Sequence, residues 1–143
     1  MNVSLSRSAA VSGEWGVNLS PPSWGTCPVG LTTIRLRRGS AGSISYAEFR
    51  HLGMEGVLGR YSLHFHLVGD TMRGSSVIGA SIWDSGNRWI TVHGTNHFLV
   101  RDCVGYQSIG HGFFLEDGTE VYNVLDRNLA VQAYQTKPLP KQV

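Results

Sequence analysis

The sequence lacks the features that several other protein classes require. Its two cysteines, Cys27 and Cys103, are too few for a disulfide framework and form no CxxC pair of the kind found in zinc ribbons. The sequence leaves open whether they pair or stay free. No apolar run approaches the roughly 18–20 residues needed to span a bilayer, and no long segment has the 3.6-residue apolar period of a helix. The chain is therefore expected to have no membrane span and little helix.

Charge is also scarce. Charged residues make up 15% of the 143 residues, and the formal net charge is only +2. The one dense basic cluster is Arg35, Arg37 and Arg38. A solvated strand edge or loop explains such a short cluster better than contact with nucleic acid. We therefore expect no nucleic-acid partner.

Glycine is abundant, with 18 residues, and short alternating segments recur between Gly, Asn, Asp and Ser. These features favour an all-β fold rich in tight turns. Three segments can be superimposed, Leu63–His66, Ile90–His93 and Phe113–Glu116, and their equivalent residues lie 27 and then 23 positions apart. That period is about one coil of a β-solenoid. The sequence predicts a right-handed parallel β-helix of about four to five coils.

A second set of strands lies between these segments, so each coil should contribute at least two strands. The set comprises Ile44–Leu52, Val77–Trp83, Phe98–Tyr106 and Val121–Val131. Apolar residues at alternate positions of the first three segments should stack inside the helix. These are Leu63, Phe65, Leu67, Ile90, Val92, Phe113 and Leu115. The side chains between them should face outward.

The outward column carries ionisable groups from three coils. His64 and His66 share one face of a strand, and His93 and Glu116 would follow on neighbouring coils about 4.8 Å apart. Three imidazoles and a carboxylate at this spacing predict a divalent-metal site, with zinc, manganese, nickel or iron as the ion. Two alternatives stay open: a hydrogen-bonded or directly catalytic carbohydrate site, and a polar ladder without a site.

Two further residues are candidates for moving a proton. His111 stands between glycines that allow another molecule to approach closely, and its ordinary pKa of about 6.5 suits a general acid or base. Asp117 follows the third segment as Asp70 follows the first, and either fits a general acid or a partner of a ligating imidazole. The alternative for His111 is a turn cap, and the alternative for the aspartates is to organise turns.

The domain boundaries follow from composition. Residues 1–131 are expected to form the β-helix, with Asn18–Pro28 as an irregular loop, and residues 132–143 to form an extended tail with two prolines. A solenoid must shield its terminal coils, yet neither end has a recognisable cap. We therefore expect a segment of a longer helix, or self-association through the uncapped ends.

Three motifs carry a family resemblance. Leu58–Asp70 is similar to a "GxYPIHFHLxGD" signature, Thr91–Asn96 to "TVHGxN", and Asp102–Gly118 to "DxxGYxxxGHxFFxEDG". Over roughly residues 4–131 the chain resembles the right-handed parallel β-helix region of the cell-migration-inducing and hyaluronan-binding protein and fibrocystin-like family, whose members carry a G8 domain. It departs from the animal pattern at Gly112, where Cys is common, and in its short connection over residues 71–76.

The resemblance implies an extracellular protein associated with carbohydrate, because some family members bind or depolymerise hyaluronan. The expected function is a polysaccharide-processing module with hyaluronidase-like activity, in which a metal assists cleavage of acidic glycans such as hyaluronan. The alternative is a noncatalytic glycan-binding or scaffold segment of a larger extracellular protein. Both assign the chain a polysaccharide partner.

Overall fold

The computed structural model describes residues 10–13, 34–36 and 39–135. These residues form strands and one short 3₁₀ helix, η1 (Asp70–Met72). The strands are β1 (Ala10–Gly13), β2 (Ile34–Leu36), β3 (Gly42–Ser45), β4 (Glu48–Arg50), β5 (Leu63–Gly69), β6 (Ser76–Ile78), β7 (Ser81–Ser85), β8 (Ile90–Thr95), β9 (Leu99–Arg101), β10 (Val104–Ile109), β11 (Phe113–Leu115), β12 (Val124–Asp126) and β13 (Leu129–Tyr134). The expected all-β class is confirmed.

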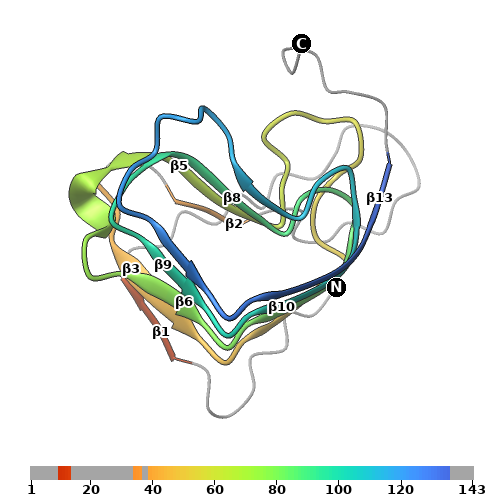
Figure 1. The fold of residues 1–143 in the computed structure, drawn as a ribbon, viewed down its shortest axis with the longest axis horizontal. Helices are drawn as coiled ribbons and strands as arrows, with labels where there is room; N and C mark the ends of the chain where they lie inside the picture. The colour runs from red at the N-terminus through yellow and green to blue at the C-terminus, as the bar shows by residue number, and fades with distance from the viewer. Residues whose placement is uncertain (1–9, 14–33, 37–38, 136–143) are drawn as a thin grey trace.

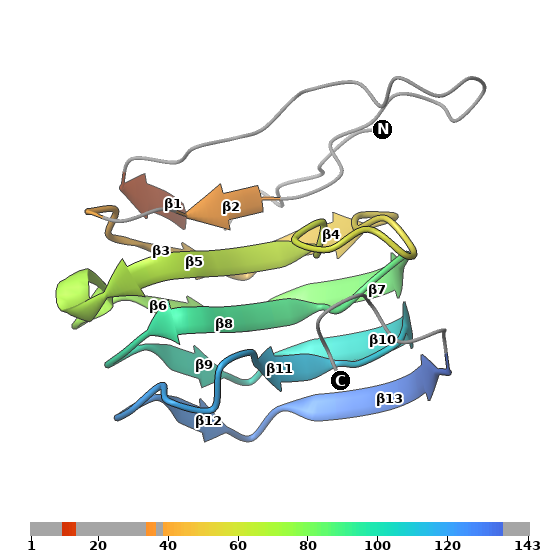
Figure 2. The ribbon, with the colours of Figure 1, turned by 90° about the horizontal axis from the view of Figure 1, so that it is seen from above.

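Three sheets surround a common interior (Figure 1). Their strand orders are β1-β3-β6-β9-β12, β13-β10-β7-β4 and β11-β8-β5-β2. From β3 onward successive strands belong to the three sheets in turn, and three consecutive strands make one round of the chain. Each strand therefore pairs with the strand three places earlier, such as β6 with β3 (Figure 2). The pairings are parallel as predicted, except that β1 runs antiparallel to β3.

Each segment of the predicted second set is two strands that meet at a corner, and not one continuous strand. The first residue of each corner has a positive φ, between 52° and 64°. These residues are Tyr46, Gly79, Asp102 and Arg127. In the first three corners the next residue is small and buried: Ala47, Ala80 or Cys103. The chain therefore turns sharply at a corner where the side-chain alternation is interrupted, since the buried positions on either side, such as Ile44 and Ala47, are three residues apart. This divides the second set between two sheets.

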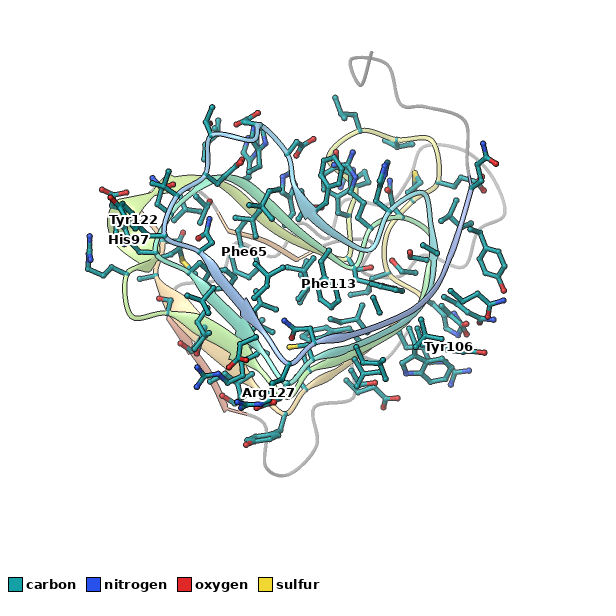
Figure 3. The ribbon with its side chains drawn as sticks, in the orientation of Figure 1. Phe65, His97, Tyr106, Phe113, Tyr122 and Arg127 are labelled. Carbon is teal, nitrogen blue, oxygen red and sulfur yellow. The ribbon has the colours of Figure 1, made fainter. Side chains whose placement is uncertain are left out.

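The register of the third sheet is the one that the repeat predicted. Leu63 pairs with Ile90 and Ile90 with Phe113, while Phe65 pairs with Val92. Phe65 and Phe113 both point into the interior (Figure 3). The ring of Phe65 lies 4.2 Å from that of Phe98 across the core. Apolar side chains from all three sheets thus form one continuous core.

Two residues predicted for this inner stack lie elsewhere. Leu67 is 49% exposed because β5 is irregular between His66 and Gly69, where Leu67 adopts a φ of 52° and Val68 takes the buried position. Leu115 is 39% exposed, since β11 is the edge strand of its sheet. The predicted inner stack is therefore wrong at these two positions.

Several sequence predictions fall outside the described residues. They are the loop at Asn18–Pro28, the surroundings of Cys27 and of Arg37 and Arg38, and the tail from residue 136 onward. Within the described part, β13 continues to Tyr134, and Cys103 is a buried free thiol whose pKa is raised by that burial. Among the residues described, no helix has the length and apolar character needed to cross a membrane.

Candidate metal centre

The four predicted ligands come from three neighbouring strands of one sheet. His66 pairs directly with His93, and His64 lies two residues before His66 on β5. Glu116 follows the last residue of β11, and its backbone N–H donates to the Val92 carbonyl at 2.9 Å. Glu116 therefore extends the ladder one step and lies beside His93.

The ligand atoms of this group are close together. Nδ1 of His66 lies 2.9 Å from Nδ1 of His93, and Oε2 of Glu116 lies 3.3 Å from that same His93 nitrogen. Nε2 of His64 is 3.7 Å from Glu116 Oε2. Tetrahedral ligand atoms bound about 2.0–2.1 Å from zinc lie about 3.4 Å from one another. This value falls within the range of the three distances between ligand atoms given above. The three histidines, whose ligand atoms all lie within 4.8 Å of one another, have the geometry to hold a metal ion.

Polar partners on the far side of two imidazoles orient their inner nitrogens. His64 Nδ1 lies 3.2 Å from the carbonyl of Gly59, which can only accept, so Nδ1 carries the proton and Nε2 the lone pair. His93 Nε2 lies 3.3 Å from the Asp117 carboxylate, which leaves Nδ1 directed at the cluster. Such outer partners are the usual means by which proteins orient histidine ligands.

The sequence predicted that the outer face of this sheet would face solvent, but much of that face is covered. His64 is 1% exposed and Thr91, on the same face, is fully buried. The connection between β4 and β5 (residues 51–62) folds over them, and the Tyr61 ring lies edge-on to the His64 ring at 4.8 Å. The site reaches solvent at its other edge, where the side chains of His93 and Asp117 are 21% and 42% exposed.

Sequence reasoning missed two residues on the covered side. The Tyr61 hydroxyl donates to Glu116 Oε1 at 2.8 Å, and Arg88 Nη1 lies 3.3 Å from the same oxygen. Burial, followed by the hydrogen bond to Glu116, raises the pKa of Tyr61 to about 12, so this tyrosine keeps its proton. Nothing in the sequence indicated that Arg88 is buried, because a single arginine after a turn is usually a surface residue.

Glu120 is a third residue that the sequence did not single out. Its Oε1 accepts hydrogen bonds from the backbone N–H groups of Gly94 and Asp117, both at 3.0 Å. Burial alone would raise the pKa of Glu120, but the backbone N–H groups around it outweigh this and lower it. An ionised Glu120 therefore ties the turn after β11 to the end of β8, which fixes Asp117 beside His93.

The remaining candidates lie at different distances from the centre. The His111 ring packs 4.8 Å from that of Phe114, and its pKa is lowered by burial and by the nearby charge of Arg88. Its described contacts lead to Phe114 and Ser108 rather than to the three histidines. Asp70 lies in η1 and accepts a hydrogen bond from Asn96 at 2.9 Å, so it does not share the position of Asp117.

The architecture defines a class: an all-β protein of stacked parallel strands with a histidine and glutamate cluster on the outer side of one sheet. Residues 30–143 match the family model described as CEMIP beta-helix. The chain belongs to this family, as the three motifs indicated.

Relatives with high similarity carry related names. The chain is 46% identical to the human cell surface hyaluronidase CEMIP2 over 101 residues. This alignment covers 66% of the chain and 7% of the relative. It is 39% identical over 106 residues to the human cell migration-inducing and hyaluronan-binding protein, covering 70% and 8%. It is 36% identical over 129 residues to human fibrocystin-L, covering 90% and 3%. The chain thus spans less than a tenth of the length of these relatives.

Proposed function

We propose that this chain is an extracellular polysaccharide-processing module that acts on acidic glycans such as hyaluronan with the help of a divalent metal ion. In this proposal the three sheets are a right-handed parallel β-helix of about four to five coils, within a longer protein. The names of two relatives, a cell surface hyaluronidase and a hyaluronan-binding protein, support the substrate class. Two expectations, the extracellular location and the polysaccharide partner, are part of the same proposal.

One observation carries it: three imidazoles and a carboxylate converge from three neighbouring rungs of one sheet. The His66–His93, His93–Glu116 and His64–Glu116 contacts are 2.9, 3.3 and 3.7 Å. His64, His66, His93 and Glu116 would hold the ion. A donor set of three nitrogens and one oxygen suits zinc, and equally manganese, nickel or iron. When bound, such an ion supplies a Lewis acid for a glycan oxygen or a water molecule.

The chain's own groups would prepare the site. The Asp117 carboxylate lies 3.3 Å from His93 Nε2 and holds that ring in place. The lowered pKa of His111 keeps its imidazole neutral near pH 7, so it is able to take a proton from a water or sugar hydroxyl. We assign His111 the proton transfer and Asp117 the orientation of His93, with general acid catalysis as its second role.

Metal binding is tested by elemental analysis and zinc titration calorimetry of the purified chain. The variants His66→Ala and His93→Ala should each lose the bound ion, while His51→Ala, an exposed histidine outside the cluster, should keep it. Stoichiometric metal in both cluster variants would overturn the assignment. Hyaluronan and other acidic glycans are then incubated with and without chelator, and chain cleavage is followed by product size.

A second function has its own supporting observation. His64 and Arg88 are each 1% exposed, which leaves only one edge of the cluster for a substrate to approach. This favours a noncatalytic glycan-binding or scaffold segment, in which the polar cluster stabilises the fold. Glycan binding without any cleavage in the product assay would support this function and reject the first.

Self-association remains a proposal for the same chain. β11, β12 and β13 are the last strands of their sheets, and Val124, Leu125 and Leu129 on them are 44–55% exposed. Edge strands with exposed apolar side chains pair readily with further strands. Sedimentation analysis should therefore detect a second copy bound at these edges, and a monomer at all concentrations would contradict this.

A further inference from the structure

The two carboxylate oxygens of Glu116 have different surroundings. Oε1 accepts the Tyr61 hydroxyl at 2.8 Å and faces Arg88 Nη1 at 3.3 Å. Oε2 faces His93 Nδ1 at 3.3 Å and His64 Nε2 at 3.7 Å. One oxygen is thus held by a tyrosine and an arginine, and the other is turned toward the histidines.

Arg88 is fixed in place by aromatic rings. Its side chain is 1% exposed, and the guanidinium carbon lies 4.4 Å from the Tyr61 ring centre and 3.7 Å from that of Phe114. Within the described residues its side-chain nitrogens make no hydrogen bond, and the Glu116 carboxylate 3.3 Å away is its counter-charge. A buried cation is strongly unfavourable without an anion, so Arg88 and the Glu116 carboxylate depend on each other.

We infer that Tyr61 and Arg88 are positioning residues, which hold Glu116 by one oxygen and present the other to His64 and His93 of the cluster. The inference rests on the proposed metal site and adds how Glu116 takes part: through Oε2 alone. A carboxylate that binds by a single oxygen leaves more of the coordination sphere to water or substrate than one that binds by two. Neither residue would touch the ion or the glycan.

The three parts come from distant places in the sequence. Tyr61 lies near the end of the connection between β4 and β5, Arg88 precedes β8, and Glu116 follows β11. Tyr61 and Glu116 are 55 residues apart. The arrangement therefore exists only when three successive rounds of the chain are stacked, which couples the site to the fold.

The first test uses Tyr61→Phe, which removes the hydroxyl and keeps the ring against Arg88 and His64. Tyr122→Phe is the matched control, because Tyr122 is 75% exposed and stacks on His97 away from the cluster. Zinc affinity of Tyr61→Phe should fall about 10–100-fold, as for other partners that orient metal ligands. It should not fall further when Tyr61→Phe is added to Glu116→Gln. Equal losses in both backgrounds, or no loss, would overturn the inference.

A second measurement is independent of metal. In chelator-treated protein at one pH, the imidazole ¹⁵N resonances of His64 and His93 should move in Tyr61→Phe and stay in place in the control. The shift should vanish when Glu116 is already Gln. If the wild type binds no zinc but this pattern holds, the proposed function fails and the positioning role stands. If the resonances do not move, or move equally without Glu116, the positioning role is rejected.

Arg88→Lys, which keeps the charge, should retain more zinc affinity than Arg88→Met, and equal affinities would reject the role of the charge.

Discussion

Replacing Gly112 with alanine gives a sharp test of how the core supports the site. A Cβ at this position would lie 2.5 Å from Cζ3 and 2.8 Å from Cε3 of Trp89. Ordinary carbon contacts are about 3.5–4.0 Å, so the indole would have to move by about 1 Å. It cannot retreat freely, because the same edge of the ring fills the space beside Gly105, and Trp89 is 1% exposed.

We expect Gly112→Ala to destabilise the fold by about 1–3 kcal/mol, the usual cost of overpacking a core. For a chain of this size that lowers the melting temperature by about 3–10 °C. Calorimetry measures this melting temperature. The same substitution is also made in a Trp89→Phe background, where the smaller ring leaves room for the added methyl group. Gly112→Ala should then cost less than in the wild type. A melting temperature within 1 °C of the wild type, or the same cost in both backgrounds, would refute the steric argument.

Three further predictions concern titration and metal affinity. Spectrophotometric titration should find one of the five tyrosines ionising near pH 12, and Tyr61→Phe should remove that transition. Because the folded pKa of Tyr61 exceeds its ordinary value of 10.0, its contribution to stability is present below pH 10 and is lost as the pH rises toward 12. Ionisation of all the tyrosines together near pH 10 would contradict this. The folded pKa of His111 is lowered by burial and then by Arg88, so the unfolded chain binds more protons and stability should fall as the pH drops below about 6.5. His111→Gln should flatten that dependence in denaturant unfolding, and an unchanged slope would count against it. Asp117→Asn should weaken zinc binding about 10–100-fold by calorimetry without unfolding the chain, since it removes the partner of His93, and full affinity would exclude that role.

The alternating pattern predicted the register of the third sheet because side chains on a strand repeat every two residues. Aligning Phe65 with Val92, and His66 with His93, required only that pattern and the 27-residue spacing. The corners were not predictable in the same way. Only one of the four, at Gly79, uses glycine for its positive φ. Asp102 is of a residue type that adopts this conformation more often than most, but Tyr46 and Arg127 are not.

The meeting of His64, His66, His93 and Glu116 was predictable because they stand at equivalent positions of the repeat. Their supporting residues were not. Arg88 is buried only because Tyr61 and Phe114 enclose it and Glu116 neutralises it, and all three come from other parts of the sequence. Likewise Glu120 acts on Gly94, 26 residues earlier, through backbone N–H groups that no residue type reveals.

The rounds of the chain differ in length, and this bears on how such a protein evolves. Glu48 pairs with Ser81, 33 residues later, whereas Ser81 pairs with Val104 only 23 residues later. The longer round contains the connection that carries Gly59 and Tyr61. Duplication of the shorter unit would therefore lengthen the stack without copying the connection that covers the cluster.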